Sequence, residues 1–185
     1  MNQTYLDTES PVGRLRLVAE SSVLIAVLWE NDPCDRVRLD TPVESSGSPS
    51  ERVLVAAKRQ LDEYFVGQRI LFDLPFALRG TPFQKQVWNA LLAIPYGQTR
   101  TYGQLADQIG NPKAVRAVGA ANGKNPISVI VPCHRVIGAS GKLTGFAGGL
   151  DAKETLLRLE ANECFEGANR SSYATNGVQS ARITR

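Results

Sequence analysis

Residues 127–149 read ISVIVPCHRVIGASGKLTGFAGG, and this stretch decides how the rest of the chain is organised. The apolar run at residues 127–131 predicts a segment that enters the interior, and Pro132 ends that run. Cys133 and His134 follow directly, and His134 is the only histidine of the chain. A loop rich in glycine comes next, with Gly138, Gly141, Gly145, Gly148 and Gly149. A thiol and an imidazole thus stand between a buried segment and a loop.

The order Pro-Cys-His suits a reactive thiol. A cysteine is a nucleophile only as its thiolate, and an adjacent base or a helix N-terminus lowers the pKa of the thiol. Proline is favoured in a first helical turn, so a short helix that begins at Pro132 would put Cys133 at its positive end. Neighbours on a helix do not face each other, so we expect a bridging water between Cys133 and His134. The alternative is a structural cysteine beside a histidine that only satisfies a hydrogen bond.

Length and composition restrict the class of protein. The 185 residues, 43% of them hydrophobic, allow one domain or two small ones. The chain has three cysteines far apart in sequence, Cys34, Cys133 and Cys164, and only one histidine. This composition argues against a zinc site and against a disulfide framework. The N-terminus lacks the features of a signal peptide, and no apolar run approaches the length of a membrane span. We therefore expect a cytoplasmic protein with no membrane partner.

Charge is distributed unevenly along the chain. Residues 79–165 hold 10 Lys and Arg against 5 Asp and Glu, whereas residues 1–78 hold 8 against 12. The basic surplus accompanies the Cys-His stretch, as expected if this half of the chain contacts a polyanion. Random scatter of surface charge explains a surplus of this size equally well.

The first part of the chain alternates between apolar and polar residues in short runs. Strands are predicted at residues 3–8, 13–20 and 23–29. Residues 31–50 form an irregular connection, and residues 48–51 have the pattern of a capping box for a helix that ends at Phe65. A further strand is expected at residues 69–74. No catalytic constellation is found here, so we assign residues 1–78 a structural role.

Helical patterns follow a linker at residues 75–80. Thr81 and Thr101 each open a capping box, with a glutamine three residues later. Helices at residues 102–110 and 112–122 are joined by a Gly-Asn-Pro turn, and this spacing predicts a helix-turn-helix.

The second of these two helices is expected to have two faces. Val115 and Val118 are predicted to point inward, while Lys113 and Arg116 lie on the opposite face among very small residues. Such a face can approach a nucleic-acid backbone closely, even in a narrow groove. The alternative is an ordinary solvated helix with two surface cations.

The last helix is predicted at residues 150–163, with Asp151 as its N-cap. Glu160 falls on or beside its buried stripe, where a carboxylate needs a partner. Pairing with His134 would orient the imidazole and raise its basicity. An exposed glutamate near the helix end is the alternative. The polar residues 166–185 are expected to be disordered.

The stretch around the cysteine resembles the active-site signature of the O6-alkylguanine-DNA alkyltransferases, or methylated-DNA–protein-cysteine methyltransferases. The signature is IVPCHRVIG at residues 130–138, and the similarity also includes RAVG at residues 116–119. The resemblance implies an α/β fold. A ribonuclease H-like domain with a small antiparallel sheet would occupy residues 1–78. A mostly helical, winged-helix-like domain with the helix-turn-helix would occupy residues 79–165, and residues 166–185 would be its tail.

The resemblance also implies a reaction. After minor-groove binding and base flipping, the alkyl group of O6-alkylguanine in duplex DNA would pass directly, irreversibly and stoichiometrically to Cys133. O4-alkylthymine is a further candidate substrate. Glu160, His134 and a water would remove the thiol proton. Tyr102 would protonate guanine N3, and Asn125 would hold the turn before the active-site strand. No cofactor and no metal are implied, and a monomer is expected, with cooperative assembly on DNA left open.

Two groups of contact residues follow from the same resemblance. Residues expected to contact DNA are Lys113, Arg116, Ala117, Gly119, Ala120, Asn122 and Gly123, with Arg116 in the gap left by the flipped nucleotide. Residues expected to line the substrate pocket are Val136, Gly145, Phe146, Ala147 and Gly148. The carbonyl groups of Cys133 and Val136 would read the guanine amino group. Phe146 stands where the family often has tyrosine.

Two other functions are compatible with parts of the pattern. A DNA-binding damage sensor or regulator would use the helix-turn-helix without alkyl transfer. A cysteine hydrolase would use the Cys-His pair on ester or amide substrates and leave the DNA-facing helix unexplained.

Overall fold

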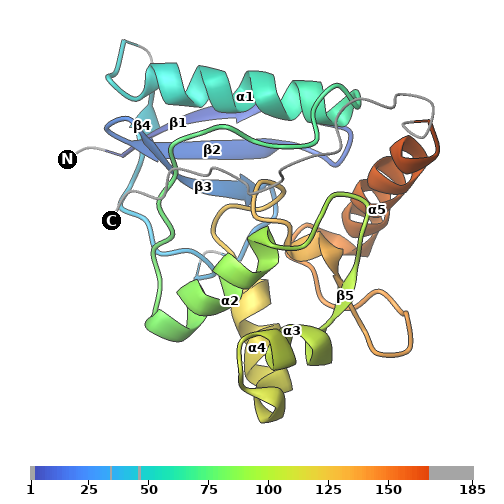
Figure 1. Ribbon diagram of the computed structural model, residues 1–185. Coiled ribbons are helices and arrows are strands. Elements are labelled where there is room, and N and C mark those ends of the chain that lie inside the picture. Colours follow the sequence, from blue (N-terminus) through green and yellow to red (C-terminus); the bar gives the residue numbers. More distant parts are fainter. Residues whose placement is uncertain (1–2, 34, 46, 167–185) are drawn as a thin grey trace.

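A computed structural model describes residues 3–33, 35–45 and 47–166 (Figure 1). The N-terminal part is a four-stranded sheet with the order β3-β2-β1-β4 and one long helix across a face. The strands are β1 (Gln3–Thr8), β2 (Leu15–Glu20), β3 (Val23–Trp29) and β4 (Val43–Glu44). The three predicted strands are confirmed, and their pairing is antiparallel. The short β4, inside the segment expected to be irregular, pairs parallel to β1.

Both faces of the central strand are covered. Leu15, Leu17 and Ala19 of β2 join the main core, whereas Val18 belongs to a small second cluster with Ile25 and Ala26. Half-buried residues of the irregular connection, Val37 and Leu39, pack against that second cluster. The connection therefore shields the face of the sheet that does not join the main core.

The helix expected to end at Phe65 is α1 (Glu51–Phe65), which lies across the sheet, but its start differs from the prediction. Ser50 is the N-cap and makes no side-chain capping bond. The carboxylate of Glu51 accepts from the backbone N–H of Gly47 at 3.1 Å, and the hydroxyl of Ser48 is 3.5 Å from that of Thr4. The predicted capping box is therefore wrong, because both of its side chains bind other groups.

The strand predicted at residues 69–74 is also wrong. The amide of Gln60, on α1, donates to the carbonyl of Asp73 at 2.8 Å and accepts from its N–H at 2.9 Å. This side chain thus occupies backbone groups that a sheet would use. Pairing with β3 occurs further along, as a single parallel bridge between Leu24 and Phe76.

The C-terminal part is mostly helical. Its elements are α2 (Pro82–Leu92), β5 (Arg100–Thr101), α3 (Tyr102–Gln108), η1 (Pro112–Ala114), α4 (Val115–Gly123), η2 (Cys133–Arg135), β6 (Val136–Ile137) and α5 (Gly149–Glu166). Both capping boxes, at Thr81 and at Thr101, are confirmed in full. Helix α3 packs on α4 at the end of the molecule away from the sheet (Figure 1).

Two helix predictions need correction. Val115 is 39% exposed rather than inward, whereas Val118 is fully buried. Val115 is the first residue of α4 and directly follows the short 3₁₀ turn η1, so it lies at the exposed start of the helix. Helix α5 starts at Gly149, so Asp151 lies in its first turn instead of capping it, and the helix extends to Glu166. The rest of the predicted tail lies outside the described residues.

The two parts share one hydrophobic core. A single cluster of buried residues includes Leu17 and Trp29 of the sheet, Leu61 of α1, Trp88 of α2 and Leu156 of α5. In the described part of the chain, no helix is long and apolar enough to cross a membrane. The shared core fixes the position of α5 relative to α1, and the site below depends on this arrangement.

Candidate active site

The predicted pairing of His134 with Glu160 is present and fully enclosed. His134 Nε2 lies 2.7 Å from Glu160 Oε1, and the two side chains are 0% and 1% exposed. Because a carboxylate accepts, Nε2 carries the proton in the neutral imidazole, and Nδ1 is left as the basic nitrogen. Nδ1 is buried and has no hydrogen-bond partner among the described residues. It is the atom at which a water could accept or deliver a proton.

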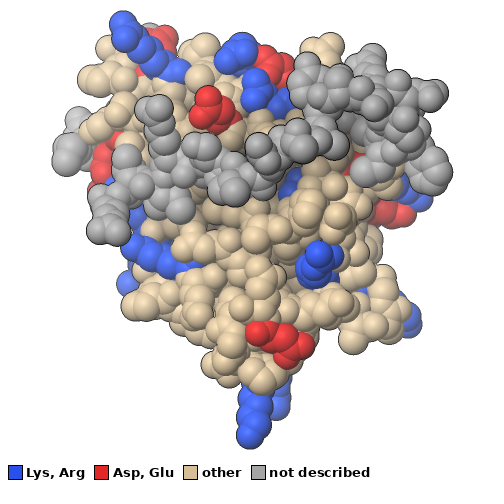
Figure 2. Space-filling view, in the orientation of Figure 1, with Lys and Arg blue, Asp and Glu red and all other residues tan. Residues whose placement is uncertain are grey.

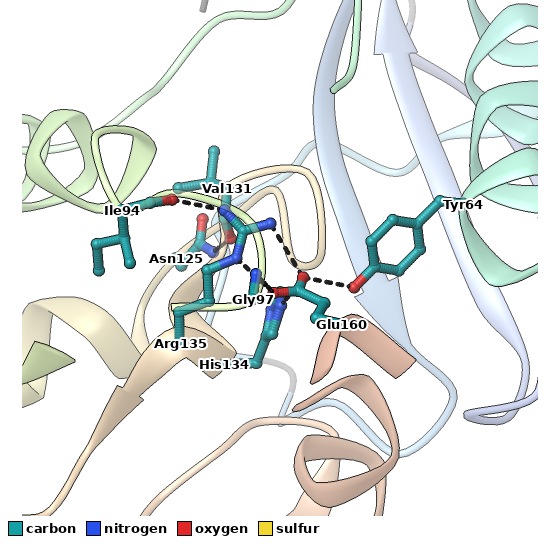
Figure 3. A network of polar contacts seen from close by, with 8 residues as sticks. All are labelled: Tyr64, Ile94, Gly97, Asn125, Val131, His134, Arg135 and Glu160. Carbon is teal, nitrogen blue, oxygen red and sulfur yellow. Dashed lines mark hydrogen bonds and ion pairs between the residues drawn. The ribbon is translucent and has the colours of Figure 1, made fainter. Parts of the chain in front are cut away.

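Glu160 also binds groups that the sequence did not indicate (Figure 3). Arg135 donates to both carboxylate oxygens, at 2.8 and 2.9 Å, and also to the carbonyl of Ile94 at 2.6 Å. The hydroxyl of Tyr64, on α1, donates at 2.8 Å, and the N–H of Gly97 donates at 3.2 Å. Arg135 could have been suspected, because an arginine in an otherwise apolar stretch needs an anion. No sequence signal pointed to Tyr64.

These contacts set the charge of each group. Burial raises the pKa of Glu160, but hydrogen bonds and charge from His134 and Arg135 outweigh it and lower the pKa to about 2. Burial lowers the pKa of His134, and the hydrogen bond and charge of Glu160 oppose that effect only in part. At neutral pH the site therefore contains an anionic carboxylate and a neutral imidazole that is able to accept a proton.

Cys133 is the first residue of a very short helical turn. Its turn is a three-residue 3₁₀ segment, and its own N–H already donates to the carbonyl of Val131 at 2.8 Å. The short helix expected after Pro132 is thus present only as one 3₁₀ turn. Burial raises the pKa of the Cys133 thiol, while Asn125, Arg36 and Lys153 act in the opposite direction. A base must remove the proton when the thiol reacts.

Asn125 holds the chain in the turn that leads to Cys133, as expected. Its side-chain N–H donates to the carbonyl of Val131 at 2.8 Å, and its side-chain oxygen accepts from the N–H of Ile127 at 3.1 Å. Residues 127–131 are buried but form a loop with one bridge, to β3, rather than the expected active-site strand. Val129 has a φ of 71°, a strained conformation for a β-branched residue.

Most of the predicted DNA-contacting residues lie on one exposed surface. Lys113, Arg116, Ala117, Ala120 and Gly123 are exposed, and Gly119 is half-buried. Figure 2 shows Lys and Arg side chains projecting from the end of the molecule formed by α3 and α4.

Asn122 is a correction to that group. Its side chain is 2% exposed and lies 3.4 Å from the carbonyl of Cys133, to which it donates. It therefore faces the active-site turn from the inner side of α4, since it lies one turn after the buried Val118.

Tyr102 and the glycine-rich loop lie beside the cysteine turn. Strand β5, just before Tyr102, pairs with β6, just after the turn. The Tyr102 hydroxyl is 3.5 Å from the carbonyl of Thr144, which also accepts from Lys153 Nζ at 2.8 Å. Lys153 donates to the carbonyl of Val136 at 2.6 Å, and Cys133 O accepts from the N–H of Val136. Both carbonyls expected to read guanine thus already accept hydrogen bonds.

The expected pocket wall packs against the N-terminal sheet. Phe146 meets Trp29 edge to face, with ring centroids 5.3 Å apart, and a Cβ on Gly148 would lie 2.6 Å from the Trp29 ring. A cavity of about 340 Å³ is lined by Trp29, Ala147 and Gly148, together with residues of the β1–β2 turn. The lining does not include Cys133, and it also lacks Val136, Gly145 and Phe146 of the expected pocket. This cavity is therefore separate from the thiol. In the described part of the chain, no group of His, Cys, Asp and Glu side chains could hold a metal ion.

Two family models and several relatives match most of the chain. Residues 3–78 match the family model "6-O-methylguanine DNA methyltransferase, ribonuclease-like domain", and residues 82–162 match "6-O-methylguanine DNA methyltransferase, DNA binding domain". A methylated-DNA–protein-cysteine methyltransferase of Methanosarcina acetivorans is 52% identical over 158 residues, which cover 85% of this chain and 98% of that protein. Its counterpart in Mycobacterium tuberculosis is 50% identical over 156 residues, covering 84% and 91%.

A solved structure agrees with these relatives. The crystal structure of Mycobacterium tuberculosis OGT in complex with DNA superposes with a TM-score of 0.76 and 48% identity, covering 88% of this chain and 94% of that one. The fold is accordingly α/β, with a ribonuclease-like sheet domain followed by a helical DNA-binding domain. With this fold and the buried Cys133, His134 and Glu160, the chain belongs to the family of methylated-DNA–protein-cysteine methyltransferases, which are enzymes of DNA repair.

Proposed function

We propose that this chain repairs O6-alkylguanine in duplex DNA by moving the alkyl group onto Cys133 in one irreversible turnover. The observation that carries the proposal is that His134, the residue after Cys133, pairs in the interior with Glu160 and has Nδ1 available for a proton. The relatives named above are methyltransferases that act on methylated DNA and on a protein cysteine.

The proposed step is a displacement at the alkyl carbon. The thiol proton passes through a water to His134 Nδ1, and the resulting thiolate attacks the carbon attached to O6. The S–C bond forms as the C–O6 bond breaks, and the hydroxyl proton of Tyr102 goes to N3 of the leaving guanine. After the transfer, His134 releases the proton that it gained to solvent, and Tyr102 takes one proton from solvent, so both groups return to their starting state. A thioether has no reverse path under these conditions, so each molecule acts once.

Base flipping is part of the proposal because the thiol is enclosed. Cys133 is 4% exposed, so an alkyl carbon inside a stacked duplex could not reach its sulfur. We propose that α3 and α4 act as the helix-turn-helix in the minor groove, with Arg116 taking the place of the extruded nucleotide. Its neighbours Ala117, Ala120 and Gly123 are exposed and small, which allows close approach to the backbone.

Several finer features are also proposals. We divide the chain into domains at about residue 79, and we expect a monomer whose copies can gather on DNA. Val136 and residues 145–148 would shape the pocket, after the loop has moved enough to open a path to the thiol. O4-alkylthymine remains a candidate second substrate.

The decisive test is the mass of the protein after reaction. We expect incubation with duplex DNA that contains O6-methylguanine to transfer one methyl group per molecule, located on the Cys133 peptide, while the lesion becomes guanine. Cys133→Ala, the control, should bind the same duplex without any gain in mass. An unmodified Cys133 with an intact lesion would contradict the proposal and favour a damage sensor. Turnover of esters or amides instead would favour a cysteine hydrolase.

A further inference from the structure

A hydrogen bond from the N-terminal half of the chain reaches the carboxylate that pairs with His134. Tyr64 lies on α1, yet its hydroxyl donates to Glu160 Oε1, on α5, at 2.8 Å (Figure 3). Oε1 is also the oxygen 2.7 Å from His134 Nε2, and it accepts from Arg135 Nη2 at 2.9 Å. Three donors thus converge on one oxygen, and one of them is the base proposed for the reaction.

The position of Tyr64 is well determined. Its side chain is fully buried, and its ring lies 5.4, 5.5 and 6.2 Å from those of Phe65, Phe72 and Tyr96. Burial raises the pKa of Tyr64 well above its ordinary value, so the hydroxyl keeps its proton and acts only as a donor toward the carboxylate.

A hydrogen bond to a carboxylate oxygen withdraws negative charge from it. The less charge Oε1 carries, the less it stabilises a positive imidazolium at His134. Among the described residues, the other charged groups that act on the imidazole are Arg135, on its own turn, and Lys153 on α5. Cys133 precedes His134 in the chain, and the Tyr96 ring faces the Arg135 guanidinium at 5.6 Å. Arg135 and Lys153 disfavour the imidazolium by charge. By withdrawing charge from Oε1, the hydroxyl of Tyr64 would act in the same direction.

We propose that Tyr64 is a positioning residue for the transfer reaction, whose hydroxyl fixes Glu160 and keeps His134 unprotonated and ready to accept the thiol proton. The inference rests on the function proposed above and adds to it that the N-terminal domain takes part in the chemistry. A residue that only filled space would leave the protonation of His134 unchanged.

The single histidine makes the test direct, because histidine-selective ¹³C labelling gives one imidazole signal to titrate. In Tyr64→Phe we expect the His134 midpoint to move to higher pH. Below that midpoint, the rate of methyl transfer should fall about tenfold for a displacement of one pH unit. At high pH, where the imidazole is neutral in both proteins, the rates should agree within about twofold.

Phe72→Leu is the matched control, because it removes a ring from the same aromatic cluster and no hydrogen bond to Glu160. It should lower the melting temperature while leaving the His134 midpoint in place. If Tyr64→Phe does not fold, 3-fluorotyrosine at position 64 provides a second measurement. Its hydroxyl is a stronger donor, so the midpoint should move to lower pH.

A midpoint that stays fixed in Tyr64→Phe or with 3-fluorotyrosine would overturn the proposal. So would a shift of equal size in Phe72→Leu. If the wild-type protein fails to transfer methyl groups, the proposed function is wrong, and the titration still shows separately whether Tyr64 controls His134.

Discussion

At the residue scale, Glu160 is an anion held in the interior by four neighbouring residues. Its two oxygens accept from Arg135, His134, Tyr64 and the backbone N–H of Gly97. The buried charge is therefore both paired and hydrogen-bonded. An isolated carboxylate could not remain charged in this place. The arrangement ties α5, the cysteine turn, α1 and the turn after α2 to one functional group.

This carboxylate predicts a pH dependence of stability. Its pKa is about 2 in the folded protein against an ordinary value of 4.5, so the unfolded chain binds the proton more readily. The contribution is complete above pH 4.5 and is lost as the pH falls through 2. We expect that loss to amount to about 3 kcal/mol, measured by urea unfolding between pH 6 and pH 2.

Glu160→Gln isolates the effect. It should destabilise the protein by about 3–5 kcal/mol at pH 7, because Arg135 loses its buried partner, and it should flatten the acidic part of the stability curve. Glu63→Gln is the control, since Glu63 is paired with Arg59 and Arg69 at the surface and should matter little. An equally steep acidic limb in Glu160→Gln would show that other carboxylates cause it.

Asn125 allows a second prediction at this scale. Asn125→Ala leaves the N–H of Ile127 and the carbonyl of Val131 buried without these partners, and we expect a loss of about 2–4 kcal/mol in unfolding free energy. Asn111→Ala is the control, because Asn111 is exposed and its side chain makes no capping bond, so it should change stability by less than about 0.5 kcal/mol. Equal losses in the two variants would refute the role given to the turn.

At the scale of elements, helix starts show where local sequence suffices. Thr81 and Gln84 exchange hydrogen bonds with each other's backbone, and Thr101 and Gln104 do the same. The predicted box before α1 fails because a strand and a turn offer Ser48 and Glu51 other partners. A capping pattern is thus reliable only where no tertiary contact competes for its side chains.

The caps can be compared by mutation. Thr81→Ala should lower the unfolding free energy by about 1 kcal/mol, because it leaves an N–H of α2 without its acceptor. Ser50→Ala should change it by less than about 0.5 kcal/mol, because the Ser50 hydroxyl makes no capping bond. Chemical denaturation of both variants decides, and a larger loss in Ser50→Ala would contradict the assignment.

At the scale of the whole molecule, the two parts are bound by shared apolar contacts. Trp29 of β3 packs on Phe146 of the glycine-rich loop, and its indole N–H donates to Ser128 Oγ at 3.2 Å. Arg36 pairs with Asp32 and donates to the backbone carbonyl of Asn125. The N-terminal domain thus supports both sides of the cysteine turn.

This shared core predicts one cooperative unfolding transition. The chain has two tryptophans, Trp29 in the sheet and Trp88 in α2, so Trp88→Phe and Trp29→Phe each leave one reporter, in opposite parts. Within each variant, fluorescence and far-UV circular dichroism should give the same denaturant midpoint. Separate midpoints would mean that the two parts unfold independently.

Local features could be predicted from the amino-acid sequence alone: three strands, the capped starts of α2 and α3, and the order Pro-Cys-His-Arg. These features depend only on short stretches of chain, because the spacing of apolar residues and the capping of a helix are local properties. They can therefore be derived without knowledge of the fold. The sequence also indicated the family, through a motif that the comparisons bear out.

The groups that surround Cys133, His134 and Glu160 could be identified only from the folded structure. Tyr64 donates a hydrogen bond to Glu160, which lies 96 positions further along the chain. Asn122, which was expected on the exposed surface, instead donates to the carbonyl of Cys133. The strand predicted at residues 69–74 fails for the same reason, since the side chain of Gln60 binds the backbone of Asp73. Tertiary packing brings together hydrogen-bond partners that are distant in the chain, and the local propensities of either segment do not indicate which residues will pair.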